Sequence, residues 1–254
     1  GVAAKYGILI QDAQALEVAH KVDTVAFDKT GTLTLGQPRL LSLHALTAQP
    51  IAMRPDEQTL LTLAASLQSG SEHPLAHAVV QAAKSQGLQL ISPENVTAVA
   101  GFGSEGVVQG RLLMLGSLRW MATFQLARDE WQARAEALQA QGATVSVLAD
   151  RTLQGVVPLA VLAFGDEPKL GVQEALATLR ARGLRLVMIS GDNVGSAQTM
   201  AARLGLHADE VHAEVMPGDK AALVKSLQHN PHGAPHVVAF VGDGINDAPA
   251  LAAA

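Results

Sequence analysis

The chain contains no cysteine and very few aromatic residues. Among its 254 residues are five Phe, two Trp, one Tyr and no Cys. The missing thiols exclude a disulfide framework, a cysteine-based zinc finger and a thiol nucleophile. Apolar residues still make up 48% of the chain, so we expect a packed core rather than disorder. Because aromatic side chains are scarce, that core must be built from Ala, Leu, Val and Ile.

The chain also lacks a basic surplus and a long apolar run. Lys and Arg total 18 against 23 Asp and Glu, a formal net charge of -5, and this balance argues against a nucleic-acid binder. No segment approaches the roughly 20 apolar residues of a membrane helix, and residues 1–5 begin no signal peptide. We therefore expect a soluble chain. Because it stops inside an expected helix at residues 251–254, we expect it to be part of a longer protein.

Helices and strands alternate after Pro168. Strands are expected at 22–27, 184–189 and 237–241, and helices at 12–20, 174–182, 197–204, 220–228 and 245–253. Near-continuous apolar strands between helices are typical of a parallel sheet covered on both faces. The strand at 22–27 has the same character but lies far upstream, which predicts a discontinuous α/β domain.

A different pattern fills the middle of the chain. Residues 51–90 carry apolar side chains at helical spacing, and short β-rich runs separated by glycines follow from 95 to 115. A helix is expected at 131–141 and paired strands at 144–148 and 153–157. This block indicates a smaller α+β unit. We predict an interrupted first domain and an inserted second one, with boundaries at 1–39, 40–157 and 158–254.

Three of the expected strands end in polar loops. The loops are DKTGTLT at 28–34, SGDN at 190–193 and GDGIND at 242–247. One such loop is most simply an ordinary turn. Three loops at the carboxyl edge of one parallel sheet, where ligands collect, favour a phosphate and Mg²⁺ site.

The side chains in these loops suit that chemistry. Asp28 and Asp243 offer the hard oxygen ligands that Mg²⁺ prefers. Ser190 in the second loop and Lys220, which lies upstream of the last expected strand, can contact phosphoryl oxygens, and glycines let backbone N–H groups approach them.

These motifs, in this order, resemble the phosphorylation domain of P-type ATPases, within the haloacid-dehalogenase-like superfamily. SEHPLA at 71–76 and GFG at 101–103 further resemble the nucleotide-binding domain of the heavy-metal-transporting branch. The resemblance covers nearly the whole chain. It implies a haloacid-dehalogenase-like parallel-sheet phosphorylation domain with an inserted α+β nucleotide-binding domain.

The resemblance implies that Asp28 is the nucleophile that takes the γ-phosphate of ATP as an aspartyl phosphate. Phosphatases of the superfamily usually carry a second Asp two residues later. This chain has Thr30 there, which cannot shuttle protons near neutral pH, so the acyl phosphate should persist. The other implied catalytic residues are Lys29, Lys220 and Ser190, the last standing where the family usually has Thr.

The cofactors implied by the resemblance are Mg²⁺ and ATP. Asp28, Asp243 and the backbone carbonyl of Thr30 would hold Mg²⁺, with Asn246 and Asp247 supporting that set.

The implied nucleotide site lies in the inserted domain. His73 would lie beside the adenine or the phosphates of ATP, and Gly101 and Gly103 would let the backbone lie against the nucleotide. Gln68 stands where the family commonly has a Glu that contacts adenine; an amide can still hydrogen-bond the adenine edge, without the charge. Further implied nucleotide contacts are Glu72, Asp166, Gly191 and Asp192.

The resemblance implies the cytosolic region of a pump that exports Cu⁺ across the cell membrane. The membrane and actuator domains of that parent chain would be its partners, and we expect the fragment to be monomeric. A Zn²⁺-type pump of the same family stays open, because residues outside this chain choose the ion. A haloacid-dehalogenase-like phosphatase with a cap domain is disfavoured by Thr30. A non-catalytic nucleotide-binding regulator is disfavoured by the intact Asp28, Lys220 and Asp243.

Two further patterns suggest sites that we do not favour. Residues 101–106 fit the dinucleotide pattern G-x-G-x-x-G, but that fingerprint must open a helix, and the residues that follow are typical of strands around a turn at Gly110. His229, His232 and His236 could suggest a metal site, but we interpret their loop as a solvated surface loop without an acidic partner.

ATP held by the inserted domain must reach Asp28, so the two connections between the domains should bend. We expect these hinges near residues 35–38 and 156–159.

Overall fold

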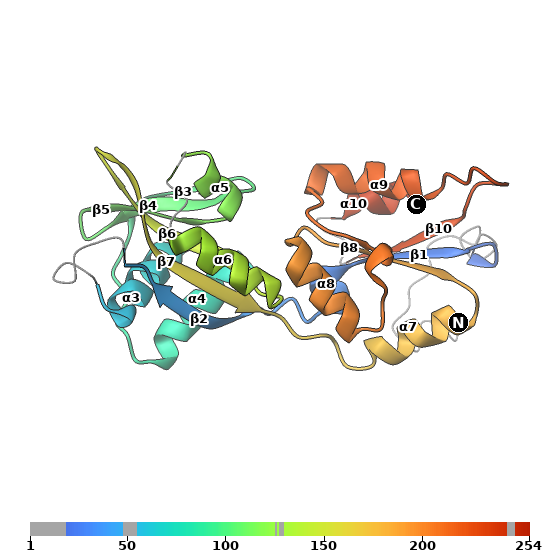
Figure 1. The fold of residues 1–254 in the computed structure, drawn as a ribbon, viewed down its shortest axis with the longest axis horizontal. Coiled ribbons are helices and arrows are strands. Elements are labelled where there is room, and N and C mark those ends of the chain that lie inside the picture. Colours follow the sequence, from blue (N-terminus) through green and yellow to red (C-terminus); the bar gives the residue numbers. More distant parts are fainter. Residues whose placement is uncertain (1–18, 48–54, 125, 127–129, 243–246) are drawn as a thin grey trace. The chain divides into compact units, whose positions relative to one another are not determined.

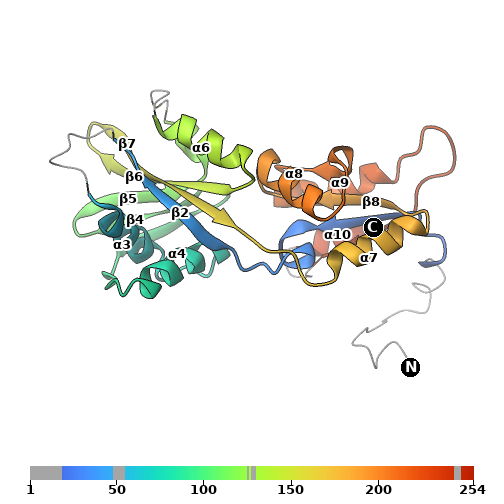
Figure 2. The same ribbon diagram turned by 60° about the horizontal axis from the view of Figure 1, so that its bottom comes forward.

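The computed structural model describes residues 19–47, 55–124, 126, 130–242 and 247–254. The helix expected at 12–20 lies almost wholly outside these residues. The chain forms two compact units, which are labelled by element in Figures 1 and 2. The first contains the described residues up to Leu33, Lys169–Gly191 and those that follow Met200, and the second contains Thr34–Pro168 and Asp192–Met200. Among the described helices, none combines the length and apolar character needed to cross a membrane.

The first unit is built on a four-stranded parallel sheet. Its strands are β1 (Thr24–Asp28), β8 (Arg185–Ile189), β9 (Val211–His212) and β10 (Val238–Val241), in the order β10-β1-β8-β9. Every neighbouring pair is parallel. Its helices are α7 (Val172–Ala181), α9 (Lys220–Leu227) and α10 (Ala248–Ala253), whereas most of α8 (Val194–Arg203) is grouped with the second unit. Strands alternate with helices, as the sequence predicts.

The register of this sheet brings three strand ends together. Phe27 pairs with Val241 and Asp28 pairs with Ile189, so the loops after β1, β8 and β10 leave the same edge. Buried apolar residues anchor α9 and α10 to one face of the sheet; they are Ala26, Val187, Ile189, Val224, Val238, Phe240 and Ala250. Helix α7 packs against β8 and lies on the other face (Figures 1 and 2).

The second unit is built on a six-stranded antiparallel sheet. Its strands are β2 (Arg39–Ala45), β3 (Glu94–Val99), β4 (Gly103–Val108), β5 (Arg111–Gly116), β6 (Thr144–Thr152) and β7 (Gly155–Gly165), in the order β2-β7-β6-β5-β4-β3. Its helices are α3 (Glu57–Gln68), α4 (Pro74–Ser85), α5 (Leu118–Ala122) and α6 (Glu130–Ala140). The sheet is covered on both faces, because one apolar cluster joins it to α3 and α4 and another to α5 and α6.

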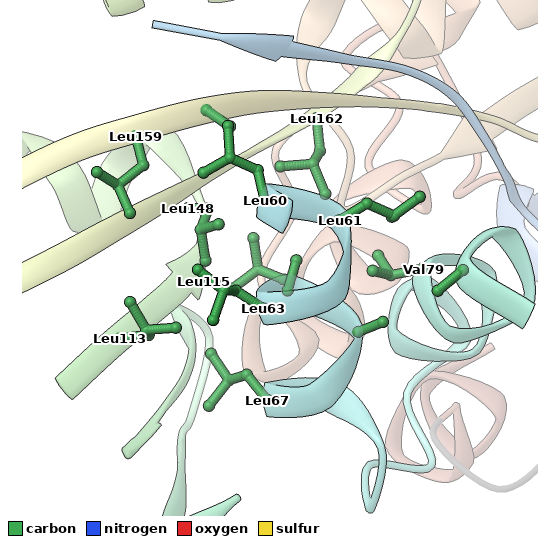
Figure 3. Packing of buried hydrophobic residues seen from close by; sticks show 14 of the residues in the cluster. Leu60, Leu61, Leu63, Leu67, Val79, Leu113, Leu115, Leu148, Leu159 and Leu162 are labelled. Atoms are coloured by element: carbon green, nitrogen blue, oxygen red, sulfur yellow. The ribbon is translucent and has the colours of Figure 1, made fainter. Parts of the chain in front are cut away.

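Helix α3 illustrates how the sequence produces this packing. Asp56 caps its start by accepting a hydrogen bond from the Thr59 N–H at 2.6 Å. Leucines at helical spacing then face the sheet (Figure 3), with Leu60, Leu63 and Leu67 each no more than 2% exposed. In place of aromatic side chains, leucines fill this part of the core, where those of α3 interdigitate with those of β5, β6 and β7.

The sequence-based assignments differ from the structure mainly in the inserted region. Strand β7 was expected to end at 157 but runs to Gly165. Residues 156–159, the expected second hinge, therefore lie inside a strand paired with β6. Pro158 hides this strand in the sequence because it cannot donate to a ladder, and the structure accommodates it at an irregularity in register opposite Ala149.

The fold class is confirmed. A parallel sheet with alternating helices carries an inserted unit of antiparallel strands and helices.

Candidate active site

Three charged side chains meet at the carboxyl edge of the parallel sheet. Asp28 ends β1, Lys220 begins α9, and Asp247 stands immediately before α10. The Lys220 Nζ donates to Asp28 Oδ1 at 2.9 Å and to Asp247 Oδ1 at 3.0 Å. All three are largely enclosed, with 10% of the Asp28 side chain, 13% of Lys220 and none of Asp247 exposed. A single ammonium group thus holds two carboxylates from elements far apart in the sequence.

The two carboxylates determine the charge state of Lys220. Burial by itself lowers the pKa of the ammonium group, but hydrogen bonds and Coulombic attraction from Asp28 and Asp247 outweigh it, so that the pKa of Lys220 is raised above its ordinary value. Lys220 is therefore a fixed positive charge beside Asp28 at neutral pH. Such a charge suits a group that carries negative charge, such as a transferring phosphoryl.

The loop after β1 curls tightly away from Asp28. Lys29 is 3% exposed, and Gly31 takes a left-handed conformation at φ 80°, which glycine adopts without steric cost. The hydroxyl of Thr32 is the one fully buried side-chain polar atom without a partner in the described part of the chain. A loop of this kind has polar groups available for a ligand.

Lys169 makes a contact with the loop after β1 that the sequence did not predict. Its Nζ donates to the Gly31 carbonyl at 2.6 Å, and its own N–H donates to the Leu33 carbonyl at 2.9 Å. No motif marks Lys169, which lies 138 residues from Gly31. It supports the turn that follows Asp28.

The other two loops also begin where the sequence predicts. Ser190, which is 1% exposed, directly follows β8; its N–H donates to the His212 carbonyl, and its carbonyl accepts from the Val215 N–H. Gly191 comes next in that loop. Gly242 follows β10, where any side chain would collide with the Asp247 carboxylate. The absence of a side chain at 242 thus lets Asp247 reach Lys220.

The donor chemistry at this edge fits Mg²⁺. Asp28 and Asp247 supply carboxylate oxygens on either side of one ammonium group, and hard oxygen donors are what Mg²⁺ takes. Two other residues predicted for the Mg²⁺ site, Asp243 and Asn246, lie outside the described residues. Within the described ranges, no cluster of three or more His, Asp or Glu side chains suited to a metal is present.

The predicted nucleotide residues of the second unit gather around the turn between α3 and α4. Gln68 ends α3 and is 7% exposed, and the Ser71 N–H donates to its backbone carbonyl at 3.0 Å. His73 caps α4, with its Nδ1 accepting from the Leu75 N–H at 3.1 Å. Since Nδ1 is the acceptor, the imidazole proton resides on Nε2, which is left to donate to a ligand.

His73 is poised as a neutral group. His73 is exposed, yet desolvation lowers the pKa of His73 below its ordinary value. The negative charge of Asp192 opposes this shift, and His77 acts in the same direction as desolvation. A neutral imidazole keeps both the helix cap and the Nε2–H donor.

The glycines of the GFG segment have structural reasons to be glycine. Gly101 has φ 76° in a turn closed by a hydrogen bond from the Phe102 N–H to the Val99 carbonyl at 2.9 Å. A side chain on Gly103 would collide with the Leu115 carbonyl. Strand β4, not a helix, follows, so the prediction that residues 101–106 are no dinucleotide fingerprint is confirmed.

The remaining predicted contacts are less enclosed. Asp166 accepts hydrogen bonds from the Gly36 and Glu167 N–H groups at 3.2 and 2.9 Å, so it ties together the two segments that connect the units. Asp192 accepts from the Ser196 hydroxyl at 3.4 Å. Glu72 is almost fully exposed and lies 3.5 Å from His77. Their contacts with nucleotide stay predictions.

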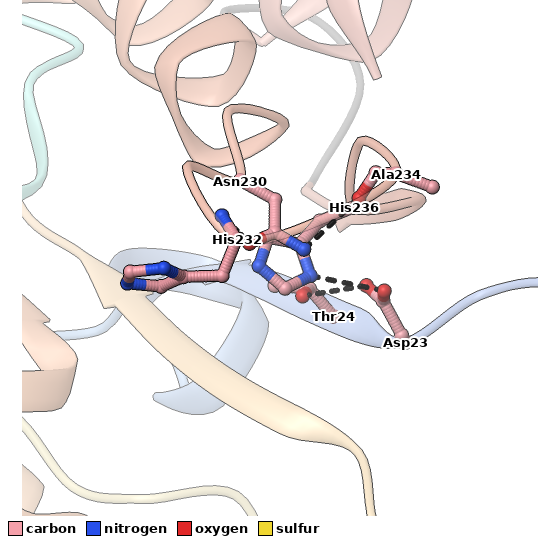
Figure 4. Close-up of polar contacts among 6 residues, drawn as sticks. All are labelled: Asp23, Thr24, Asn230, His232, Ala234 and His236. Atoms are coloured by element: carbon pink, nitrogen blue, oxygen red, sulfur yellow. Dashed lines mark hydrogen bonds and ion pairs between the residues drawn. The ribbon is translucent and has the colours of Figure 1, made fainter.

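The histidine loop supplies no acidic residue of its own, but it has an acidic partner elsewhere in the chain. His236 Nδ1 lies 3.0 Å from Asp23 Oδ2, just before β1 (Figure 4). His232 points away from this pair (Figure 4), and its N–H donates to Asn230 Oδ1. Burial of Asp23 opposes its charge, yet hydrogen bonds from His236 and Thr24 lower the pKa of that carboxyl. The pair fastens the loop to the sheet.

Residues 22–254 match the family of haloacid dehalogenase-like hydrolases. The chain belongs to this family. The match includes β1 with Asp28 and every other element of the parallel sheet.

Within this family, the chain is similar to curated P-type ATPases. The chain is 42% identical over its whole length to the probable copper-transporting ATPase PacS of Synechococcus elongatus, of which it covers 32%. It is 42% identical to a probable copper-exporting P-type ATPase of Archaeoglobus fulgidus, covering 29% of that protein. It is 39% identical to a silver-exporting P-type ATPase of Salmonella typhimurium, covering 29%. The chain thus spans about a third of the length of the curated relatives it matches.

Solved structures of P-type ATPases also match this chain. A zinc-transporting PIB-type ATPase in the E2.Pi state matches 99% of this chain at 36% identity with a TM-score of 0.62, the chain covering 38% of it. The catalytic domain of the CPx-ATPase CopB-B matches at a TM-score of 0.72, but its 24% identity supports the fold alone; the chain covers 82% of it. The likeness to P-type ATPases, predicted from the motifs, is therefore confirmed.

Proposed function

We propose that this chain is the ATP-binding and phosphorylation region of a P-type pump and that Asp28 is its phosphoryl acceptor. One observation carries the proposal. Lys220 holds Asp28 and Asp247 within 3.0 Å of its ammonium group at the carboxyl edge of a parallel sheet. The likeness of the whole chain to P-type ATPases supports the same function.

The proposed step is the transfer of one phosphoryl group. An oxygen of the Asp28 carboxylate forms a bond to the γ-phosphorus of ATP, and the bond from that phosphorus to the oxygen bridging the β-phosphate breaks, so that ADP leaves. Lys220 stabilises negative charge on the transferring group from a fixed position. Ser190, which directly follows β8, offers a hydroxyl at the same edge of the sheet.

Magnesium would be held by the Asp28 and Asp243 carboxylates and the Thr30 carbonyl, with Asp247 and Asn246 in support. When bound, it offsets phosphate charge and orients the oxygens of the γ-phosphate.

Thr30 separates this proposal from the phosphatase alternative. A phosphatase of this superfamily would need an acid–base group two residues after the nucleophile, and a threonine hydroxyl is too weak an acid and too weak a base to serve as one near neutral pH. The aspartyl phosphate is then slow to hydrolyse within this chain. A persistent intermediate suits a pump, whose conformation must change before the phosphate is released.

The nucleotide is proposed to bind to the second unit. His73 would donate from Nε2, Gln68 would contact the base, and Gly101 and Gly103 would let the backbone approach. The predicted boundary at 157 falls inside β7, which continues to Gly165 in the sheet of the second unit. We therefore assign the nucleotide-binding domain to residues 40–165 and the phosphorylation domain to 1–39 with 166–254.

The proposed cargo is a heavy-metal ion, and we favour Cu⁺. Names of the relatives specify copper or silver export, whereas one structural neighbour transports zinc. The parent would lie in the cell membrane, with this region on the cytoplasmic side and joined to membrane and actuator domains.

The proposal is tested by incubating the protein with γ-labelled ATP and Mg²⁺. We expect label that survives acid and is removed by hydroxylamine, as an acyl phosphate is. A phosphatase would instead hydrolyse small phosphoesters without retaining label. A regulator would bind nucleotide and do neither.

A further inference from the structure

Three aromatic side chains lie in a row beside the GFG segment, residues 101–103. The ring centres of Phe102 and Trp120 are 6.3 Å apart with their planes at 40°, and those of Trp120 and Phe124 are 6.4 Å apart at 51°. Tilted rings at such separations attract each other. A chain that has only five Phe and two Trp places three of them together here, and we call these three residues the aromatic row.

The middle of the aromatic row is held firmly. Trp120 is 7% exposed in α5, where its N–H donates to the Ser117 hydroxyl at 3.2 Å. Its ring lies directly over Gly116, where any side chain would collide with it. On its other side is Phe124, whose ring centre is 5.9 Å from the guanidinium carbon of Arg151, a cation–π distance. The Trp120 ring is therefore a fixed surface within the row.

Phe102 carries the only side chain of the GFG segment, because glycines flank it. Its N–H donates to the Val99 carbonyl at 2.9 Å, and its carbonyl accepts from the Ser117 N–H at 2.8 Å. The backbone of Phe102 is thus tied to the protein on both sides, while its half-buried ring packs on Trp120. What the segment has left to present to a ligand is the backbone of its two glycines.

An aromatic residue between two glycines can serve a nucleotide site in two ways. Its ring can stack on the base, as aromatic side chains do in many nucleic-acid sites, or it can hold the glycines in place. The contact with Trp120 favours the second role, because a ring already packed on a fixed neighbour has less of its surface left for a base.

We propose that Phe102 is a positioning residue of the nucleotide site: packed on Trp120, its ring holds the GFG segment so that the backbone at Gly101 and Gly103 lies against the nucleotide. The inference rests on the proposed function, which places the nucleotide at this segment. It goes beyond that function by assigning a role to two aromatic residues that act through the segment rather than by contact with ATP. Loss of the ring should weaken ATP binding without slowing phosphoryl transfer once ATP is bound.

A double-mutant cycle tests the inference. Phe102→Ala removes the ring, Trp120→Leu removes the surface on which it packs, and isothermal titration calorimetry with Mg²⁺ and ATP gives the dissociation constants. We expect each single variant to bind ATP about five- to tenfold more weakly, the scale of one aromatic pair. The double variant should lie within about twofold of the single ones, because both changes break the same contact. Phe102→Leu, which keeps part of the apolar contact, should fall between Phe102→Ala and the unaltered protein, and it serves in place of Phe102→Ala if the alanine disturbs folding.

Trp131→Leu is the matched control. Trp131 is 7% exposed, as Trp120 is, and belongs to the same apolar cluster, but it lies in α6 and outside the aromatic row. We expect this variant to lose stability in denaturant titrations and to bind ATP as the unaltered protein does. A role in the core alone would give the same pattern for Trp120→Leu.

Label incorporation separates positioning from chemistry. For Phe102→Ala, we expect the ATP concentration that gives half the maximal labelling rate to rise by the same factor as the dissociation constant. The maximal rate itself should be unchanged, because the groups around Asp28 are untouched.

The possible outcomes are distinct. The inference is overturned if Phe102→Ala leaves ATP affinity unchanged, or if Trp131→Leu weakens it as much as Trp120→Leu. It is also overturned if Phe102→Ala weakens ATP binding and Trp120→Leu does not, or if the two effects add, because the ring then contacts the nucleotide itself. In each of these cases ATP still binds and labels Asp28, and only the inference falls. If ATP neither binds nor labels the unaltered protein, the proposed function itself is wrong.

Discussion

At the scale of single residues, Lys220 is the most consequential side chain. It separates two carboxylates that would otherwise repel each other in an enclosed site. We predict that Lys220→Met slows phosphoenzyme formation by about 100- to 1,000-fold, the range for loss of a preorganised charge at a reacting group. The rate of label incorporation checks this. Lys225→Met, an exposed lysine of the same helix, should label at the normal rate; equal rates for both variants would remove Lys220 from the chemistry.

The charge on Lys220 also predicts a pH dependence. Its pKa in the folded protein is raised above the ordinary value of 10.5, so the stabilisation from its ion pairs is fully present below that ordinary value and is lost as the pH rises through the folded pKa. The difference in free energy of unfolding between the unaltered protein and Lys220→Met should therefore be constant from pH 6 to 9. Denaturant titrations measure it, and a difference that fades within this window would mean that Lys220 is not held as an ammonium ion.

His73 tests the nucleotide site. Replacement by Gln removes the Nε2–H donor in its present geometry, and we predict that ATP binding weakens by about 1–2 kcal/mol, the scale of one hydrogen bond in a partly closed site. Calorimetry measures the change, with far-ultraviolet circular dichroism expected to be unaltered. His77→Gln, one turn later in α4 and exposed, is the control. Equal affinity in both variants would reduce His73 to a helix cap.

At the scale of elements, helix α3 contributes many of the buried side chains in the core of the second unit. Leu63 is 2% exposed among leucines of α3 and the sheet, and we predict that Leu63→Ala destabilises this unit by about 2–5 kcal/mol. Both tryptophans, Trp120 and Trp131, lie in the second unit, so tryptophan fluorescence during denaturation reports on it. Leu41→Ala, in a side chain that is 64% exposed, should cost little. Similar losses for both variants would contradict the packing.

Local pattern predicts the elements that bury one regular face. The leucines of α3 recur at helical spacing, and β8 and β10 are nearly continuous apolar runs. The existence and type of these elements could therefore be predicted. Short or interrupted elements could not. Strand β9 has only two residues, too few for a period, and Pro158 conceals the continuity of β7.

The pair of His236 and Asp23 marks another limit of local pattern. These residues are 213 positions apart and share no motif, so only the folded chain brings them together. By contrast, Asp28 and Ser190 could be predicted because motifs mark the ends of their strands, and parallel strands bring their carboxyl ends to one edge. The contact of Lys220 with Asp247 completes the site in a way that composition alone does not specify.

At the scale of the whole molecule, we propose a different function for each of the two units. One carries the phosphoryl acceptor and the other carries the predicted nucleotide residues. Within the described ranges, no group of three potential metal ligands is present. We therefore predict slow Mg²⁺-dependent ATP turnover that micromolar Cu⁺ or Zn²⁺ does not stimulate. Phosphate release under reducing conditions, with and without each ion, measures this; clear stimulation would reveal a metal-sensing site, with residues 229–236 examined first.

The central claim is that Asp28 takes the phosphoryl group, and labelling of Asp28→Asn tests it most directly. The amide keeps the shape of the carboxylate and removes the attacking oxygen anion. We expect this variant to bind ATP as the unaltered protein does and to retain no acid-stable, hydroxylamine-labile label. Asp209→Asn, an exposed aspartate of the same unit, should label normally. Undiminished label on Asp28→Asn would place the phosphoryl group elsewhere and contradict the account.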